Sequence, residues 1–424
     1  MSLDLEFVRK QFPAFNNDET SSWIFMENAG GSYVPESVIN KLNHFMIHTK
    51  VQPYGLYQPS IDATQAIEKS TCLMAEMINA THSEVVIGHC TTMNLVMLSL
   101  ALKSWFMPSD EIIVTNQDHE SNISPWRRLA ESGQKIIEWK MNSNNAELDI
   151  AHLESLLSNK TKLVCMTHSS NIVASVNDIK KIADLVHANG ALLLVDGVSY
   201  APHHSINVKD LNVDFYVLSL YKTFGPHLGL LYVDKKHHDK LTNQSLEFMP
   251  KQYEKITTPG SPNYLRIALN PGGVNHEEAA CLSGLTDYYR LLHGHHFTKN
   301  KESVFAVVED VFKLIADHQA KLSKIFIEYI NENNAIKLIG KNESDTNLRS
   351  PTFAFTLKNK LSCQDVVKAL AKRNIAAQAG SFYAWRCLEA LGINPYEGLA
   401  RVSFAHYNTE NEVHLLCQSL NEIL

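Results

Sequence analysis

The sequence predicts an α/β protein with a mostly parallel sheet, followed by a smaller α+β unit. Between residues 85 and 235, short apolar runs alternate with helical segments. These runs are apolar at nearly every position, which is typical of strands covered on both faces. After about residue 300 the pattern changes to a long helical stretch and then to separated strands and helices. Together these observations favour two structural units built on different plans.

The elements of the first unit follow from these runs. The expected strands cover residues 85–88, 111–115, 135–140, 162–167, 191–195, 215–218 and 229–233. The expected helices begin at Thr92 and cover about 122–132 and 178–189. Strands that alternate with helices in this way form βαβ units, in which neighbouring strands are parallel.

The second unit begins after the turn at residues 270–273, Asn-Pro-Gly-Gly. Its expected helices cover about 303–333, 363–373 and 409–423, and its expected strands cover 352–357, 375–378 and 401–404. We therefore divide the chain into an N-terminal segment, residues 1–16, which packs with the small domain, a large domain, residues 17–275, and a C-terminal small domain, residues 276–424.

Composition excludes several classes of function. The 424 residues include 38 basic and 45 acidic side chains, a formal net charge of −7. This mild acidity argues against a nucleic-acid or anionic-membrane partner. No stretch approaches the roughly 18 apolar residues that span a bilayer. The N-terminus does not resemble a signal peptide, and the seven cysteines form no CxxC pair. We therefore expect a cytoplasmic protein with free thiols.

Polar residues follow several of the apolar runs, where an open α/β sheet binds its ligands. The most informative are Asp196, which closes residues 191–195, and Lys222, which lies in S-x-Y-K-x-x-G-P. Either alone would fit a helix-capping aspartate or a surface lysine. Together they suit pyridoxal phosphate (PLP): the amine forms a Schiff base, and the carboxylate keeps the ring nitrogen protonated, so that the ring accepts electrons.

The motifs around this pair resemble a known family. They are E-N-A-G-G (27–31), T-H-S-S-N (167–171), V-D-G (195–197), S-L-Y-K-T-F-G-P (219–226) and R-V-S-F-A-H-Y-N-T (401–409). Their order and spacing resemble the class V branch of fold-type I PLP enzymes, which includes cysteine desulfurases and selenocysteine lyases. The resemblance covers nearly the whole chain. It implies a fold-type I PLP-dependent transferase fold and a homodimer with the cofactor site at the interface.

The resemblance also implies roles for individual residues. The expected catalytic residues are Lys222, which binds the cofactor, Asp196, which pairs with its ring nitrogen, and His119, which stacks on its ring. The other expected cofactor contacts are Thr91, Thr92, Asn171, Ser199, Ser219, Tyr221 and Gly273. The expected substrate contacts are Arg401, which grips the carboxylate, Ala29 and Tyr383. Without the family, His119, Asn171, Thr91 and Thr92 fit helix caps and turns, and Arg401 fits a surface arginine.

Several positions depart from the family pattern. Tyr383 stands where desulfurases carry the nucleophilic cysteine. Cys387, four residues later, is expected to pack as a small hydrophobic side chain. Tyr221 replaces the histidine usual before the lysine, and Ser199 stands where a glutamine would contact the cofactor. Gly273 replaces a threonine that reaches the partner subunit's phosphate.

The leading prediction is a PLP enzyme that acts on a small amino acid by cleaving a C–S or C–Se bond. Transamination, racemisation, epimerisation or other chemistry at Cα without a cysteine nucleophile is the first alternative. A PLP-binding protein without enzymatic activity is the second. We expect no metal site: His293, His295 and His296 have no carboxylate or cysteine at ligand spacing, and a solvated loop is expected there.

Overall fold

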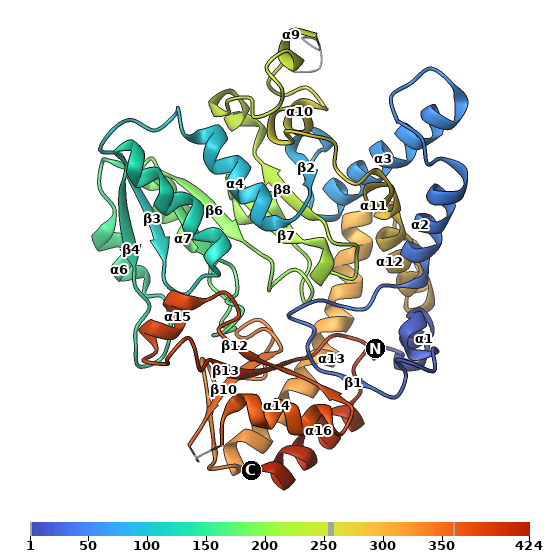
Figure 1. Cartoon of the computed structure of the whole chain (residues 1–424), viewed down its shortest axis with the longest axis vertical. Coiled ribbons are helices and arrows are strands. Elements are labelled where there is room, and N and C mark those ends of the chain that lie inside the picture. The colour runs from blue at the N-terminus through green and yellow to red at the C-terminus, as the bar shows by residue number, and fades with distance from the viewer. Residues whose placement is uncertain (1, 253–257, 359–360) are drawn as a thin grey trace.

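The computed structural model describes residues 2–252, 258–358 and 361–424 (Figure 1). Its large sheet has seven strands in the order β2-β8-β7-β6-β5-β3-β4. They are β2 Val85–Gly88, β3 Glu111–Thr115, β4 Lys135–Trp139, β5 Thr161–Thr167, β6 Leu192–Asp196, β7 Phe215–Ser219 and β8 Gly229–Val233. Only β8 runs antiparallel to its neighbours β2 and β7; the other pairs are parallel. The predicted strands and the mostly parallel sheet are confirmed.

Helices cover both faces of this sheet, which explains why its strands are apolar throughout. One face packs in a core with α2 Glu36–His48, α3 Gln58–Met77, α6 Ile150–Leu156, α7 Ile179–Ala188, α8 Val208–Leu211, α11 His276–Cys281 and α12 Ser283–His296. The other face packs with α4 Thr91–Leu102, α5 Ser124–Arg127 and α10 Tyr264–Leu269. Short elements elsewhere are α9 Met249–Gln252 and the 3₁₀ helices η1 Pro13–Phe15, η2 His82–Glu84, η5 Leu220–Lys222 and η6 Lys235–Lys240.

The helix expected at about 122–132 is not continuous. It consists of η3 Glu120–Asn122, α5 and η4 Arg128–Ser132. Pro125 occupies the first turn of α5, and a proline has no N–H with which to extend a preceding helix. The chain therefore restarts its helix there and ends it at Gly133, whose φ of 97° is left-handed.

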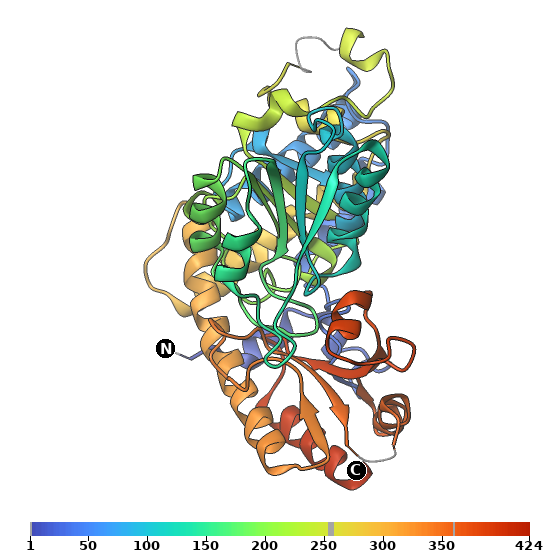
Figure 2. The ribbon, with the colours of Figure 1, turned by 90° about the vertical axis from the view of Figure 1, so that its left-hand side faces the viewer.

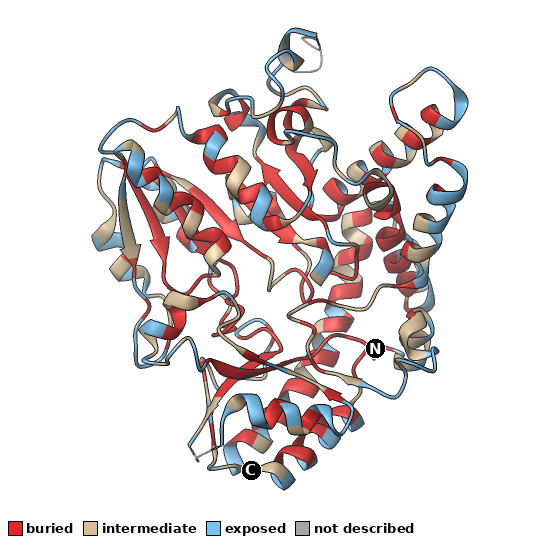
Figure 3. Cartoon of the chain, viewed as in Figure 1, coloured by how far each residue is buried: buried red, intermediate tan, exposed pale blue. Residues whose placement is uncertain are grey.

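The C-terminal unit is built on an antiparallel sheet of order β12-β13-β10-β9. Its strands are β9 Ile336–Leu338, β10 Thr352–Leu357, β12 Gln378–Gly380 and β13 Leu399–Ser403, and its helices include α14 Cys363–Ala371, α15 Trp385–Ala390 and α16 Glu410–Ile423. Figure 3 shows α14 and α16 buried on the side that faces this sheet and exposed on the other. The smaller α+β unit is thereby confirmed.

The strand expected at 375–378 is divided between two sheets. Its first part, β11 Ile375–Ala376, pairs in parallel with β1 Ile24–Phe25, whereas β12 pairs with β13. One apolar run cannot reveal this division, because the partner of β11 lies about 350 residues earlier in the chain. This pairing places residues 24–25, which the sequence assigned to the large domain, beside the small domain.

Two further segments connect the units. The helix α13 Val304–Glu332 contributes its first half to the core of the large sheet and its second half to that of the small sheet; Figure 2 shows it running along both. In α1 Leu5–Lys10, Arg9 donates to Glu412 of α16 at 2.8 Å. The domain boundaries after residues 16 and 275 stay predictions; packing is continuous across residue 275, since α11 and α12 lie on α2 and α3.

The three clustered histidines do not lie in a loop, so this expectation was wrong. They end α12, and His293 and His296 are buried. His296 Nε2 accepts the Asp4 N–H at 2.9 Å, and His295 stacks on Phe7 with ring centres 3.7 Å apart. The helix α1 therefore packs on this end of α12, where His295 stays exposed.

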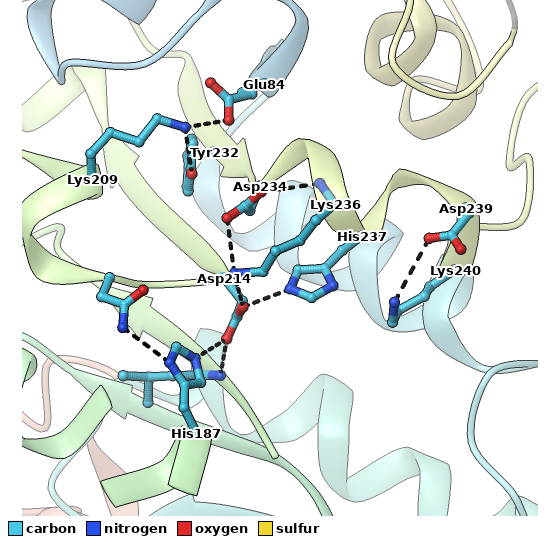
Figure 4. Close-up of polar contacts among 12 residues, drawn as sticks. Glu84, His187, Lys209, Asp214, Tyr232, Asp234, Lys236, His237, Asp239 and Lys240 are labelled. Atoms are coloured by element: carbon cyan, nitrogen blue, oxygen red, sulfur yellow. Dashed lines mark hydrogen bonds and ion pairs between the residues drawn. The ribbon is translucent and has the colours of Figure 1, made fainter. Parts of the chain in front are cut away.

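A buried carboxylate anchors the other end of β7, far from the ends of the strands discussed below (Figure 4). Asp214 accepts from His187 at 2.7 Å, His237 at 2.6 Å, Lys236 at 3.1 Å and the Leu193 N–H at 2.8 Å. These hydrogen bonds hold the pKa of Asp214 below its usual value although burial opposes them. The cluster therefore joins α7, β6 and η6 at the start of β7.

Within residues 2–252, 258–358 and 361–424, no helix combines the length and apolar content that a bilayer crossing requires.

Candidate active site

A cavity of about 770 Å³ lies beyond the carboxyl ends of β5, β6 and β7, between the two units. It has the size of a small-molecule site. Its lining includes Ala29, Thr91, Thr92, His119, Asn171, Asp196, Ser199, Ser219, Tyr221, Lys222, Tyr383 and Arg401. Gly273 is the one predicted site residue that the described lining lacks; it is exposed and follows the bend at residues 271–272. The structure thus brings together residues spread over about 370 positions.

Strand register explains this convergence. Thr167 at the end of β5 pairs with Asp196 at the end of β6, and Asp196 pairs with Val217 of β7. Because these strands are parallel, their carboxyl ends share one edge. Lys222 follows β7 by one 3₁₀ turn, η5, so it lies at that same edge.

Burial shifts the pKa values of both Lys222 and Asp196. It lowers the pKa of Lys222 to about 8, assisted by the Arg401 charge and opposed by Asp196 and Glu27. Burial raises the pKa of Asp196 to about 6, opposed by a hydrogen bond from the Val198 N–H at 2.9 Å and by Lys222. An amine with a lowered pKa is a better nucleophile at neutral pH, which suits covalent binding of a carbonyl cofactor.

A second carboxyl group, Asp118, lies in the cavity wall and was given no role from the sequence. Burial, then the Asp196 charge, raise its pKa well above the usual value. Its oxygens accept from Asn122 Nδ2 at 2.7 Å and from the His119 N–H at 2.9 Å. Asp118 therefore keeps its proton more readily, and Asp196 is the carboxylate that interacts with Lys222. The sequence feature that could have identified Asp118 is its place among the polar residues that follow β3.

His119 presents a neutral ring to the cavity. Burial, with the charges of Lys222 and Arg401, lowers its pKa to about 3. Its Nδ1 accepts from the Ser121 N–H at 3.1 Å, which assigns the proton to Nε2. The ring centre lies 5.6 Å from that of Tyr383. An uncharged aromatic ring held in this way can stack on a flat heteroaromatic ligand.

The start of α4 lies at one end of the cavity. The hydroxyl of Thr91 donates to Leu218 O at 3.0 Å, so Thr91 offers an anion its backbone N–H rather than its hydroxyl. The Thr92 hydroxyl is 2.8 Å from that of Ser121. At Gly229 an added Cβ would lie 2.5 Å from Thr91 N, so this close approach requires glycine. Free N–H groups at a helix N-terminus bind phosphate well.

The opposite end contains Arg401, which the small domain contributes. Its Nη2 donates to Glu27 Oε1 at 3.0 Å and its Nη1 to Asn171 O at 3.3 Å. The Phe382 ring lies 3.9 Å from the guanidinium carbon. Arg401 Nε and Asn171 Oδ1 are buried without a partner among the described residues, as expected of groups that await a ligand. Sequence reasoning missed Glu27, although it lies in the quoted E-N-A-G-G motif, and Phe382.

The segment that carries Tyr383 is fixed to the large domain. Phe382 and Tyr383 have left-handed φ values of 52° and 55°, and Asn171 Nδ2 donates to Phe382 O at 2.9 Å. The Glu120 N–H donates to Tyr383 O at 2.8 Å, and Arg386 contacts both Glu120 carboxylate oxygens at 2.5 Å. Consecutive left-handed residues cost energy that such contacts must offset.

The nearby thiols are not placed as nucleophiles. Cys387 is fully buried in α15, in one core with Ile172 and Leu399, and burial raises its pKa to about 12. The expectation that it packs as a small hydrophobic side chain is confirmed. Among the described lining residues, Cys90 is the one cysteine. Its sulfur accepts the Met93 N–H at 3.5 Å, at the start of α4.

The cavity fits PLP. The lysine and the aspartate lie at one sheet edge, the neutral His119 ring is beside them, the helix N-terminus can receive a phosphate, and Asn171 has an unpartnered amide oxygen. These residues would hold the cofactor, and the cofactor would supply an electron sink for bonds at the substrate Cα.

Comparisons with known proteins identify the family and the fold. The family model Aminotransferase class-V matches residues 24–264 and 303–416. An aminotransferase-like protein of Gibberella zeae is 38% identical over 100% of this chain and 99% of its own length. A cysteine desulfurase-like protein of Aspergillus flavus is 30% identical over 100% and 91% of the two chains. The apo structure of a cysteine desulfurase from Thermococcus onnurineus NA1 shares the fold, with a TM-score of 0.84, 24% identity and coverage of 100% and 98%. The chain therefore belongs to the class V aminotransferase family of PLP-dependent enzymes.

Proposed function

We propose that this enzyme acts on a small amino acid and cleaves its C–S or C–Se bond. The observation that carries the proposal is one cavity that holds the half-buried Lys222 and the buried Asp196 at the sheet edge and a buried arginine, Arg401, opposite. The similarity to a cysteine desulfurase-like protein supports the choice of bond. Membership of a family of enzymes argues against the alternative of a PLP-binding protein without activity.

Four side chains of this protein have separate roles in the proposed reaction. The Nζ of Lys222, with its lowered pKa, can take the proton from the substrate Cα and return it. Asp196 holds its negative charge for the ring nitrogen of the cofactor, which supplies the electron sink. Arg401 binds the substrate carboxylate, and the neutral ring of His119 covers one face of the site.

The environment of the thiols decides where the sulfur goes. Tyr383 has no thiol and Cys387 is buried with a raised pKa, so neither accepts sulfur. We infer that the electron pair of the C–S bond leaves with sulfur as sulfide. With cysteine, the remaining three-carbon fragment takes up water and yields pyruvate and ammonia. This outcome differs from transfer to a protein thiol.

Transamination, racemisation or other chemistry at Cα is the second candidate. The same observation supports it, because these reactions need no thiol nucleophile, and Tyr383 lies where one would be. Both candidates use Lys222, Asp196 and Arg401 in the same way. They differ in whether a bond at Cβ breaks.

A single-turnover screen of amino acids separates the candidates. Sulfide with pyruvate indicates cleavage, pyridoxamine phosphate indicates transamination, and loss of optical activity indicates racemisation. In parallel, borohydride should trap PLP on Lys222 of the wild-type protein and trap none in Lys222→Ala. Trapping on another lysine, or none on wild type, would contradict the site assignment.

We further infer a homodimer. Apolar side chains are exposed on α2 and the loop after it, including Met46, Ile47 and Leu56, the last 99% exposed, and burial of such side chains favours association. Gly273 could then offer a backbone N–H to a partner's phosphate. Light scattering that shows a monomer with full cofactor content would contradict this.

The free state of the seven cysteines agrees with the expected cytoplasmic location, which stays a prediction.

A further inference from the structure

The Arg401 guanidinium is already covered before a substrate arrives. Its side chain is only 3% exposed. Glu27 occupies Nη2, the backbone oxygen of Asn171 occupies Nη1, and the Phe382 ring covers one face of the group. Nε has no partner among the described residues. Both two-point geometries of a carboxylate on a guanidinium, Nη1 with Nη2 and Nε with Nη2, use the Nη2 that Glu27 contacts, so a substrate carboxylate must compete with Glu27 for it.

Glu27 is the neighbour that can move at the lowest cost. The Asn171 oxygen belongs to the backbone. Phe382 is held by the Asn171 side chain, which donates to its carbonyl at 2.9 Å, and it lies in a turn fixed to the large domain. The Glu27 side chain, in contrast, is 24% exposed and lines the cavity, so its carboxylate can rotate into the cavity and be solvated.

The position of Glu27 is built into the backbone. Residue 27 forms a bridge with Ser403 on the strand that carries Arg401, which places the two side chains together. An added Cβ at Gly30 would lie 2.1 Å from Glu27 Oε2 and 2.3 Å from Oε1. Gly30 does not have a left-handed φ, so it serves to make room for this carboxylate rather than to shape a turn.

We propose that Glu27 is a specificity-determining residue that occupies the substrate carboxylate's place on Arg401 in the free enzyme and is displaced by it. This inference rests on the proposed function in one respect, that Arg401 binds the substrate carboxylate. The exchange conserves charge at the guanidinium, because one carboxylate leaves as another binds. A ligand without a carboxylate gains nothing from opening the pair.

The size of the effect follows from competition. When only a fraction of the molecules has a free guanidinium, the apparent affinity for a carboxylate falls by that fraction. If the pair is closed in about nine molecules of ten, removing the Glu27 charge tightens carboxylate binding about ten-fold.

The test uses two probes that each carry one half of an amino acid. Propionate binding is measured by titration calorimetry, and n-propylamine binding by the absorbance change of the bound cofactor. In Glu27→Gln, the dissociation constant of propionate should fall about ten-fold, while that of n-propylamine stays close to wild type. Glu277→Gln is the matched control, because Glu277 is similarly covered and pairs with Lys50 at 2.7 Å outside the cavity lining.

Gly30→Ala provides a second variant that keeps the charge. Its Cβ must push the Glu27 carboxylate from its place, so propionate should again bind more tightly than in wild type. Unchanged or weaker propionate binding in both variants, with unfolding temperatures near wild type, would overturn the proposal. Propionate is also titrated without PLP, so that a failure of borohydride trapping at Lys222 counts against the proposed function alone.

Discussion

The lowered pKa of Lys222 predicts how fast the protein captures its cofactor at each pH. Only the neutral amine attacks a carbonyl group. A lysine with the ordinary value of 10.5 is about 0.03% neutral at pH 7, whereas one with a pKa of about 8 is about 9% neutral. The buried amine should therefore react about 300-fold faster at pH 7 than its ordinary ionisation allows. Because deprotonation activates the amine, the rate at which Lys222 captures PLP should rise about ten-fold per pH unit below pH 8 and stay constant above pH 8.

The assay mixes cofactor-free protein with PLP between pH 6 and pH 9.5, quenches with borohydride at set times and measures labelled Lys222 by mass spectrometry. PLP ionises too, so each rate is divided by the rate for N-acetyl-lysine at the same pH, which cancels that contribution. Lys222→Ala gives the background from other lysines.

One outcome would refute this reasoning. A normalised rate that does not change with pH, as for two amines of the same ordinary pKa, would show that burial does not lower the pKa of Lys222. Because the Arg401 charge contributes to the lowering, Arg401→Gln should move the midpoint to higher pH.

Three other substitutions test the remaining assignments. Asp196→Asn should bind PLP but lose about 10²–10⁴ in turnover, since an amide cannot stabilise the protonated ring nitrogen; unchanged turnover in a cofactor-saturated variant would count against its role. Asp214→Asn should lower the free energy of unfolding at pH 7 by about 1.5–3 kcal/mol, because it removes the buried charge that accepts hydrogen bonds from His187, His237 and the Leu193 N–H. Because the folded pKa of Asp214 lies below the ordinary 3.8, this difference from wild type persists above pH 4 and shrinks below it; denaturant titrations at pH 7 and pH 3 measure it. Cys387→Ser should keep any sulfide-releasing activity, and a persulfide on Cys387 after turnover with cysteine would contradict this.

The sequence predicts the large sheet well because its strands are buried on both faces. Runs such as β6 leave little choice of structure, and their carboxyl ends place Asp196 and Lys222 together. The run at 375–378 was harder to interpret, because its division depends on a partner strand near residue 24. The helix expected at about 122–132 is interrupted near Pro125, a residue that the sequence shows directly.

Within the site, the sequence indicated which side chains take part but not which neighbours they already contact. Thr91 was expected to contact the cofactor, and its hydroxyl already donates to Leu218 O. Arg401 was expected to be free for a carboxylate, and Glu27 already contacts it. Both contacts join residues more than 100 positions apart, and local patterns carry no information about such pairs.

The 29 residues of α13 extend over about 44 Å at 1.5 Å per residue. Because this one helix supplies apolar side chains to both cores, such as Val311 to one and Phe326 to the other, neither unit has a complete core of its own. Separate expression of either unit would expose half of the helix's apolar face to water. We therefore expect the two units to unfold together, so that the chain melts in a single calorimetric transition.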